Sequence, residues 1–184
     1  WTSAYRKNAL YSNFDYSAKM RRSGAENASN YLAVRMGSAV DSTNGMLWNP
    51  GYILGYANVG MYVIYRIDEG GARTAIQPWT ETDAILPGDW NTLRVVANEG
   101  QFKFYINGKL LRTFTDTTFS SGAVGFQMYK DAPDSGILEV TWARLYGLLA
   151  PAAEGDVVSA QQEALNLRAL QSPERGTPEL SPLD

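Results

Sequence analysis

Alternating apolar and polar positions divide the stretch from Trp90 to Met128 into four short runs, at residues 92–98, 101–106, 109–115 and 123–128. Glu99-Gly100 and Asn107-Gly108 join the first three runs, and a Ser-Ser-Gly turn precedes the fourth. Asn-Gly between two alternating runs is the strongest short signal for a β-hairpin, because a type I′ turn needs a positive φ at both central residues. The stretch is therefore predicted to form an antiparallel meander, which needs a second layer to pack against.

Similar runs fill most of the chain before residue 150. Bounded by Gly, Asn, Asp and Pro turns, they bring the expected total to about ten or eleven strands. The further runs lie at residues 14–20, 31–36, 52–56, 61–67, 72–79 and 137–146. No long helical pattern interrupts them, so residues 1–149 are predicted to form an all-β, antiparallel sandwich.

The composition changes from Ala150 onward, where prolines and acidic residues replace the aromatic ones. Residues 150–184 hold 6 acids and 2 bases, whereas residues 1–149 hold 13 acids and 14 bases. An apolar stripe runs through Val157, Ala160, Ala164, Leu167 and Leu170. It predicts one helix near residues 156–171, capped by Asp156 and stopped by Pro173. A helix this short is marginal alone in water, so it is expected to dock on the sandwich or on a protein partner. The alternative is a solvated linker to a further domain.

Two side chains are missing from the whole sequence, histidine and cysteine. This excludes Ser-His and Cys-His nucleophiles, histidine-ligated metals, disulfides and thiolate chemistry within the chain. The net charge of −3 gives no electrostatic reason to expect nucleic acid as a partner. No apolar run approaches the roughly 18 residues that a membrane span requires. The chain begins at Trp1 without a signal peptide, so it is expected to be a processed product or a fragment.

Several blocks of the sandwich carry a family resemblance. Those with the most specific pattern are residues 88–97, which read GDWNTLRVVA, and residues 104–109, which read FYINGK; the others are 14–21, 30–35, 51–56, 61–66 and 116–126. Together they resemble the concanavalin A-like lectin/glucanase superfamily, in its laminin-G-like bacterial branch. They are also similar to the domain of 3-keto-disaccharide hydrolases. The resemblance implies a jelly-roll sandwich of two curved sheets, a fold that hosts lectins, glycosidases, adhesion modules and inert spacers alike.

Glycoside hydrolysis usually needs two carboxylates at a set separation. The E-x-D-x-x-E pattern that jelly-roll glucanases place on one strand is missing, and Asp68-Glu69-Gly70-Gly71 is typical of a hairpin turn. Asp15 and Glu139 alternate with apolar neighbours, so both are expected to face solvent. We therefore predict no catalytic residue, and a glycosidase-like hydrolase is the alternative hypothesis.

Carbohydrate sites offer aromatic platforms flanked by hydrogen-bonding groups. The strand expected at residues 61–67 is apolar on both faces, which indicates that its second face is either covered or lines a groove. The residues that could line such a groove are Arg35, Tyr52, Tyr56, Tyr62, Arg66 and Trp79. The competing interpretation is that these aromatic side chains fill the core. Trp90 and Trp142 are predicted to pack on the core.

Asp131 and Asp134 stand three apart in one loop and are weak candidates for a structural calcium site. A turn built by Asp and Pro is the favoured interpretation of this loop, and no other cofactor is expected. The sequence as a whole favours a non-catalytic binding or structural module of an extracellular or cell-surface bacterial protein, with a glycan as its ligand. A further alternative is an adhesion or assembly component that is tethered through its C-terminal tail.

Overall fold

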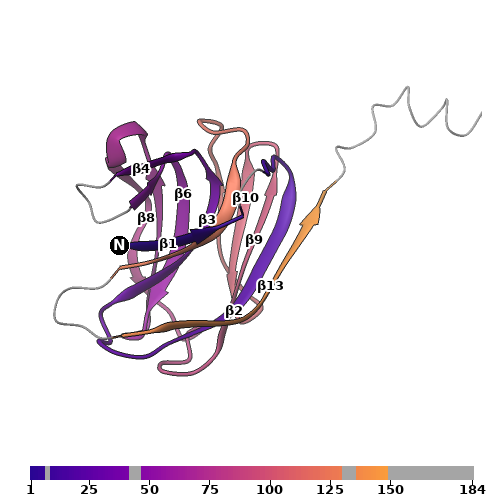
Figure 1. The fold of residues 1–184 in the computed structure, drawn as a ribbon. Helices are drawn as coiled ribbons and strands as arrows, with labels where there is room; N and C mark the ends of the chain where they lie inside the picture. Colours follow the sequence, from indigo (N-terminus) through magenta and orange to yellow (C-terminus); the bar gives the residue numbers. More distant parts are fainter. Residues whose placement is uncertain (7–8, 42–46, 130–135, 149–184) are drawn as a thin grey trace, which may run out of the picture. The chain divides into compact units, whose positions relative to one another are not determined.

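The computed structural model describes residues 1–6, 9–41, 47–129 and 136–148 (Figure 1). The chain divides into two compact units, Trp1–Leu148 and Leu149–Asp184, and every described residue belongs to the first. The helix predicted near residues 156–171, the Pro-containing tail and the calcium candidates Asp131 and Asp134 lie outside the described residues.

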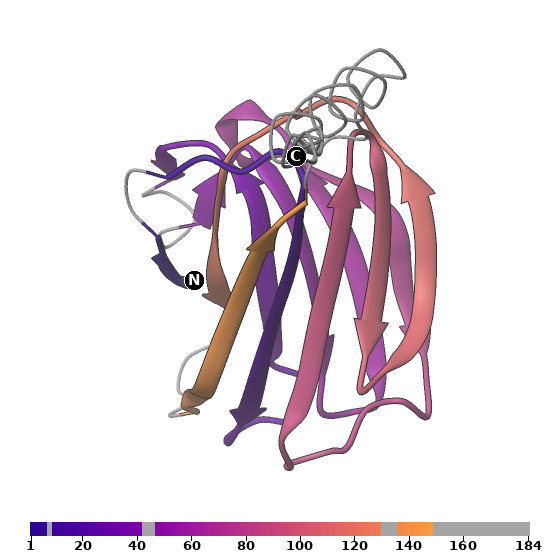
Figure 2. The same ribbon diagram turned by 90° about the vertical axis from the view of Figure 1, so that its right-hand side faces the viewer.

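Two antiparallel sheets make up the first unit (Figure 1). The six-stranded sheet has the order β1 (Thr2–Tyr5), β12 (Ala123–Met128), β3 (Ser29–Met36), β6 (Gly51–Ala57), β7 (Met61–Ile67) and β8 (Arg73–Glu81). The five-stranded sheet has the order β11 (Lys109–Thr115), β10 (Gln101–Ile106), β9 (Asn91–Asn98), β2 (Phe14–Arg22) and β13 (Leu138–Gly147), and Figure 2 shows it from its outer side. A separate hairpin pairs β4 (Ala39–Asp41) with β5 (Leu47–Asn49). The prediction of an all-β antiparallel sandwich is confirmed.

The hairpin at Asn107-Gly108 forms as predicted. Both residues have a positive φ, 48° and 83°, and they join β10 to β11. The fourth run of the meander behaves differently, because β12 pairs with β1 and β3 in the opposite sheet. Residues 116–122 thus carry the chain from one sheet to the other. Local turn chemistry specifies the three-stranded part, whereas the crossing depends on contacts with distant strands.

The main core lies between the two sheets. Strands β2, β9 and β10 contribute every second residue to it, and β3, β6 and β7 contribute one of their two faces. Its largest buried members include Phe14, Met20, Leu32, Tyr52, Tyr56, Phe102 and Phe104. This strict alternation on β2, β9 and β10 is the pattern that the sequence displays.

A second apolar cluster covers the outer face of the six-stranded sheet. It includes Tyr31, Ala33, Met36, Trp48, Ile53, Val63 and Ile67. Trp48 comes from β5 and is almost fully buried, so the β4–β5 hairpin helps to cover this face. Of the two possibilities left open for the strand at residues 61–67, the covered second face is the one observed.

Candidate functional site

The three tyrosines proposed for a sugar groove lie in the main core. Tyr52 and Tyr56 are fully buried and Tyr62 nearly so, and all three pack between the sheets. Burial raises the pKa of Tyr56 to about 12 and also raises the pKa of Tyr52. Their rings are therefore structural, and the prediction that they line a groove is corrected: alternation along β6 and β7 points them inward, toward Phe102 and Phe104.

Arg35 is a buried structural clamp. Its guanidinium donates hydrogen bonds to the carbonyl oxygens of Ser12 (2.7 Å), Glu99 (2.5 Å) and Phe119 (2.9 Å). It also stacks over Phe102, at 4.7 Å from the ring centroid. Burial lowers its pKa, but the carbonyl groups supply the partners that a buried cation needs. Arg35 thus holds three loops together and presents no atom toward a ligand surface.

Arg66 lies at the same end of the sandwich and joins two carboxylates. It donates to Asp68 at 2.8 Å and to Asp116 at 3.2 Å. The Tyr52 hydroxyl donates to Asp116 as well, at 2.8 Å. Burial acts to raise the pKa of Asp116, yet hydrogen bonds from Thr118, Tyr52 and Arg66 hold it below its ordinary value. A carboxyl group kept ionised in this way is a poor proton donor, which disfavours general acid catalysis here.

Trp79 is the one member of the predicted set with a substantially exposed ring. It lies on the edge strand β8 and is 36% exposed. The predicted residues thus separate into core tyrosines, a buried clamp, an ion-paired arginine and an edge tryptophan, and they do not converge on one groove. In the described part of the chain, no group of three or more Asp or Glu side chains is arranged to hold a metal ion.

A hollow of about 660 Å³ lies at the margin of the six-stranded sheet, beside β1 and β5. Tyr5 lines it, and its ring lies on that of Trp48, with 4.2 Å between the centroids. The Tyr5 side chain is 47% exposed, whereas Trp48 is buried beneath it. Ser38, Ser121 and Arg6 add polar groups to the lining, and Leu10 adds an exposed apolar one. The volume is in the range typical of small-ligand sites.

Two buried polar atoms lie close to this hollow. Gln127 donates a hydrogen bond to the carbonyl oxygen of Trp48 at 3.1 Å. The Trp48 indole N–H and the Gln127 Oε1 atom have no hydrogen-bond partner among the described residues. Buried polar groups are normally paired with protein or with water, so this pair offers hydrogen-bonding capacity that the surrounding described residues do not use.

An aromatic cluster lies at the other end of β1. The Trp1 ring contacts Tyr31 and Tyr129, with centroids 5.4 Å and 5.2 Å apart, and Arg73 stacks over Trp1. Tyr31 is buried and donates to the Ser29 hydroxyl at 2.7 Å, and its burial raises its pKa to about 12. Because these rings cover one another, the cluster offers less free ring surface than Tyr5 does.

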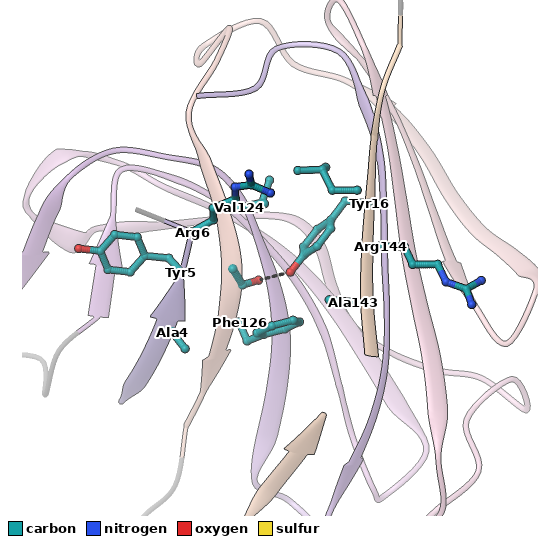
Figure 3. A pocket seen from close by; sticks show the side chains of 10 residues that line it. Ala4, Tyr5, Arg6, Tyr16, Val124, Phe126, Ala143 and Arg144 are labelled. Carbon is teal, nitrogen blue, oxygen red and sulfur yellow. Dashed lines mark hydrogen bonds between the residues drawn. The ribbon is translucent and has the colours of Figure 1, made fainter. Parts of the chain in front are cut away.

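A narrower cavity of about 340 Å³ opens where β1 and β12 face β13 (Figure 3). Tyr16 crosses it and donates to the carbonyl oxygen of Gly125 at 3.4 Å. Most of its lining is apolar: Ala4, Val124, Phe126, Ala143 and Leu145. Arg144 points away from it in Figure 3. The cavity therefore continues the apolar interior to the side of the sandwich. It does not present several polar groups that point at one ligand.

Both tryptophans that were predicted to pack on the core lie outside it. Trp90 is half-buried and lies under the Arg21 guanidinium, at 4.8 Å. Trp142 is also half-buried, and Arg144 lies over its ring at 4.7 Å. A β-bulge between Val140 and Trp142 shifts the alternation by one residue, and this turns Trp142 outward. A bulge leaves no reliable mark in a sequence, so the simple period-two pattern gave the wrong side.

Sequence reasoning missed Tyr5 and Trp48. They belong to strands of four and three residues, which are too short to display a period-two pattern. The available signal was compositional, because both are aromatic residues in segments for which no strand was predicted.

Comparison with solved structures supports the architecture. The carbohydrate binding module CBM66 from Bacillus subtilis aligns with a TM-score of 0.53 at 21% identity, over 76% of this chain and 75% of that one. Sheep galectin-11, solved in complex with glycerol, aligns with a TM-score of 0.51 at 15% identity, over 79% and 95%. The Bacillus licheniformis β-glucanase gives 0.54 at 12% identity, over 77% and 69%. The chain has the concanavalin A-like jelly-roll fold.

No protein-family model and no curated protein matches the sequence. At these identities the structural similarities establish the jelly-roll fold, and the site must be argued from the side chains. Within the described residues, no helix is long and apolar enough to cross a membrane.

Proposed function

We propose that this jelly roll is a non-catalytic carbohydrate-binding module that acts outside the cell or at the cell surface, and that the Tyr5 hollow holds a sugar unit. The observation that carries the proposal is the half-exposed Tyr5 ring, which is backed by Trp48 inside a hollow. A sugar presents an apolar C–H face that stacks on such a ring, and hydroxyl groups that need nearby polar partners.

Rigidity supports Tyr5 as a platform. Trp48 lies beneath the ring, and backbone pairing of Tyr5 with Gly125 fixes the strand that carries it. An added Cβ on Gly125 would come within 2.7 Å of the Tyr5 Cα, so only glycine permits this approach of β1 to β12. A ring that is already ordered loses little conformational entropy when a ligand binds.

Two features of the side chains support a non-catalytic role. The chain has no histidine, and the carboxylates of Asp68 and Asp116 both form salt bridges with Arg66. The carbohydrate-binding names among the structural neighbours are consistent with this function, and the glucanase among them marks the alternative, a saccharide hydrolase.

Affinity electrophoresis and calorimetry against mixed-linkage β-glucan, xylan, mannan and galactan would test the proposal. We expect one of these polymers to bind, and Tyr5→Ala to weaken its binding by about tenfold or more, because a central aromatic anchor is lost. Trp79→Ala removes a comparable exposed ring far from the hollow and should leave binding unchanged. Binding that survives Tyr5→Ala but is lost in Trp79→Ala would contradict the hollow as the site. Release of reducing sugar would overturn the non-catalytic role.

A further inference from the structure

The outer face of the five-stranded sheet is cationic, although the whole chain carries a net charge of −3. Outward positions on β2, β9 and β10 alternate with buried ones, and the outward positions of β13 lie opposite those of β2. They carry five cations, Lys19, Arg21, Arg94, Lys103 and Arg144, and two carboxylates, Asp15 and Glu139. This face therefore attracts anions.

Arginines on this face lie over aromatic rings. Arg21 stacks on Trp90, Arg94 stacks on Tyr105 at 5.2 Å, and Arg144 stacks on Trp142. Stacking holds a guanidinium flat against the sheet and leaves its N–H edges free to bind a carboxylate in the plane of the group.

Two of these arginines already have carboxylate partners. Arg94 donates to Asp15 at 2.8 Å, and Arg21 donates to Glu139 at 3.0 Å. Among the described residues, Arg144 has no carboxylate partner, and it points away from the side cavity (Figure 3). Lys19 lies beside it on the neighbouring strand, opposite Trp142. Two of the three cations of this face that lack a carboxylate partner among the described residues, Arg144 and Lys19, thus lie on β13 and its neighbour β2.

Along β13, three outward residues alternate as ring, cation and ring: Trp142, Arg144 and Tyr146. The bulge before Trp142 places this ring on the same face as the other two. Tyr146 is 60% exposed. At about 3.3 Å per residue, the Trp142 and Tyr146 Cα atoms are about 13 Å apart, so the strip is long enough for more than one unit of a polymer. β13 is also an edge strand, with β2 as its neighbour on one side.

We propose that this strip, Trp142, Arg144 and Tyr146 with Lys19, binds an acidic polysaccharide whose sugar units carry carboxylates. The exposed Tyr146 ring suits the apolar face of a sugar, and the Arg144 guanidinium, which lies flat on Trp142, suits a carboxylate together with Lys19. Charge alone fits any polyanion. The exposed Tyr146 ring beside these cations favours a sugar acid over an acidic peptide. The strip lies on the sheet opposite the Tyr5 hollow, and the proposal holds whether or not that hollow binds a sugar.

Calorimetry on the full chain with three probes tests this proposal. Polygalacturonate supplies a carboxylate on every sugar, its fully methyl-esterified form has the same backbone without the charge, and poly-L-glutamate has the charge without the sugar. We expect binding of polygalacturonate that added salt weakens, at least about tenfold weaker binding of poly-L-glutamate, and none of the ester. Equal binding of the ester, equal or tighter binding of poly-L-glutamate, or no binding of polygalacturonate would each overturn the proposal.

Matched variants locate the site. Arg144→Gln and Tyr146→Ala should each weaken polygalacturonate binding by roughly tenfold, and Arg144→Lys, which keeps the charge but loses the planar fork, should lie in between. Arg112→Gln removes one exposed charge from β11, outside the strip, and should change the affinity less than about twofold. Equal losses in Arg144→Gln and Arg112→Gln would show a response to overall charge and refute the strip. Tyr5→Ala changes no residue of the strip and Arg144→Gln changes no residue of the Tyr5 hollow, so the two sites can fail independently.

Discussion

The two sheets differ in what covers their outer faces. On the six-stranded sheet, every residue of β3 and β6 is buried, because a second apolar layer packs on the outside. On the five-stranded sheet, buried and accessible residues alternate along β2 and β9, and the accessible ones include ion-paired and ring-stacked arginines. An antiparallel sheet needs only one buried face, so the extra coverage on the six-stranded sheet has its own causes in β1 and β5.

The outer faces of the two sheets therefore differ in what they contribute to stability and to ligand binding. Coverage by Trp48 and the N-terminal strand leaves the six-stranded sheet a hollow only at its margin, where Tyr5 emerges. The five-stranded sheet keeps its face open and charged, so any ligand there would meet flat stacked guanidinium groups rather than a pocket. Stability should therefore depend strongly on outward side chains of the first sheet and weakly on those of the second.

Replacing Trp48 by Ala should give the largest effect. Removing a buried tryptophan leaves a cavity and typically costs 3–5 kcal/mol, so we expect a loss of about 4 kcal/mol in the free energy of unfolding. Trp90→Ala removes the same side chain from the outer face of the other sheet and should cost only about 1 kcal/mol, since that ring is half-buried. Urea denaturation of both variants measures the difference. Equal losses would mean that the two faces are equivalent.

The second-largest loss of stability is expected from adding one methyl group to the covered face of the six-stranded sheet. A Cβ on Gly55 would lie 2.2 Å from the Asn30 carbonyl oxygen and 2.4 Å from the Tyr31 ring. Gly55→Ala is therefore expected to destabilise the fold by about 2–3 kcal/mol through overpacking. Gly147, at the end of β13, has nothing within 4 Å of its Cβ position. Gly147→Ala should be neutral or slightly stabilising, and a shared destabilisation in thermal unfolding would refute the contrast.

The contrast between the faces was partly visible in the sequence. Apolar residues at consecutive positions in 61–67 signalled a strand whose second face is either covered or lines a groove, and the alternation from Asp15 to Arg21 signalled one open face. The strands β7, β10, β11 and β12 have the predicted bounds, because glycine-containing turns mark their ends. What covers the first face was not predictable, since β4 and β5 are too short for a periodic signal.

The sequence could predict that the candidate site contains aromatic rings, but it could not predict which residues form it. Aromatic content pointed to ring stacking, but period two gives two equivalent faces and does not say which one is inside. Choosing the wrong face for Tyr52, Tyr56 and Tyr62 placed the groove in the core. The bulge at Val140 likewise reversed the side of Trp142. Both errors arise because register and bulges depend on strand pairing, which local sequence does not encode.

Asp116 offers an intermediate case, a partly buried charge at the end of the sandwich. Its Tyr52 and Arg66 hydrogen bonds should make Asp116→Asn cost about 2 kcal/mol at neutral pH. The folded-state pKa of Asp116 lies below its ordinary value, so this contribution is fully present above about pH 4 and is lost as the pH falls through the folded-state pKa. Urea denaturation across this range should show wild type and variant converging in acid. A constant difference would mean that the ionised carboxylate is not what stabilises the fold.

The Asp15–Arg94 pair should give the smallest effect, although its geometry is good. Arg94 donates to Asp15 at 2.8 Å and stacks on Tyr105, but its side chain is 46% exposed. Exposed pairs gain little because water and salt screen them, so a double-mutant cycle with Asp15→Asn and Arg94→Gln should give a coupling energy of at most about 1 kcal/mol. That coupling should fall as salt is added. A larger and salt-insensitive coupling would show that the open face, too, contributes structural interactions, and would remove the distinction between a covered sheet that stabilises and an open sheet that is free to bind.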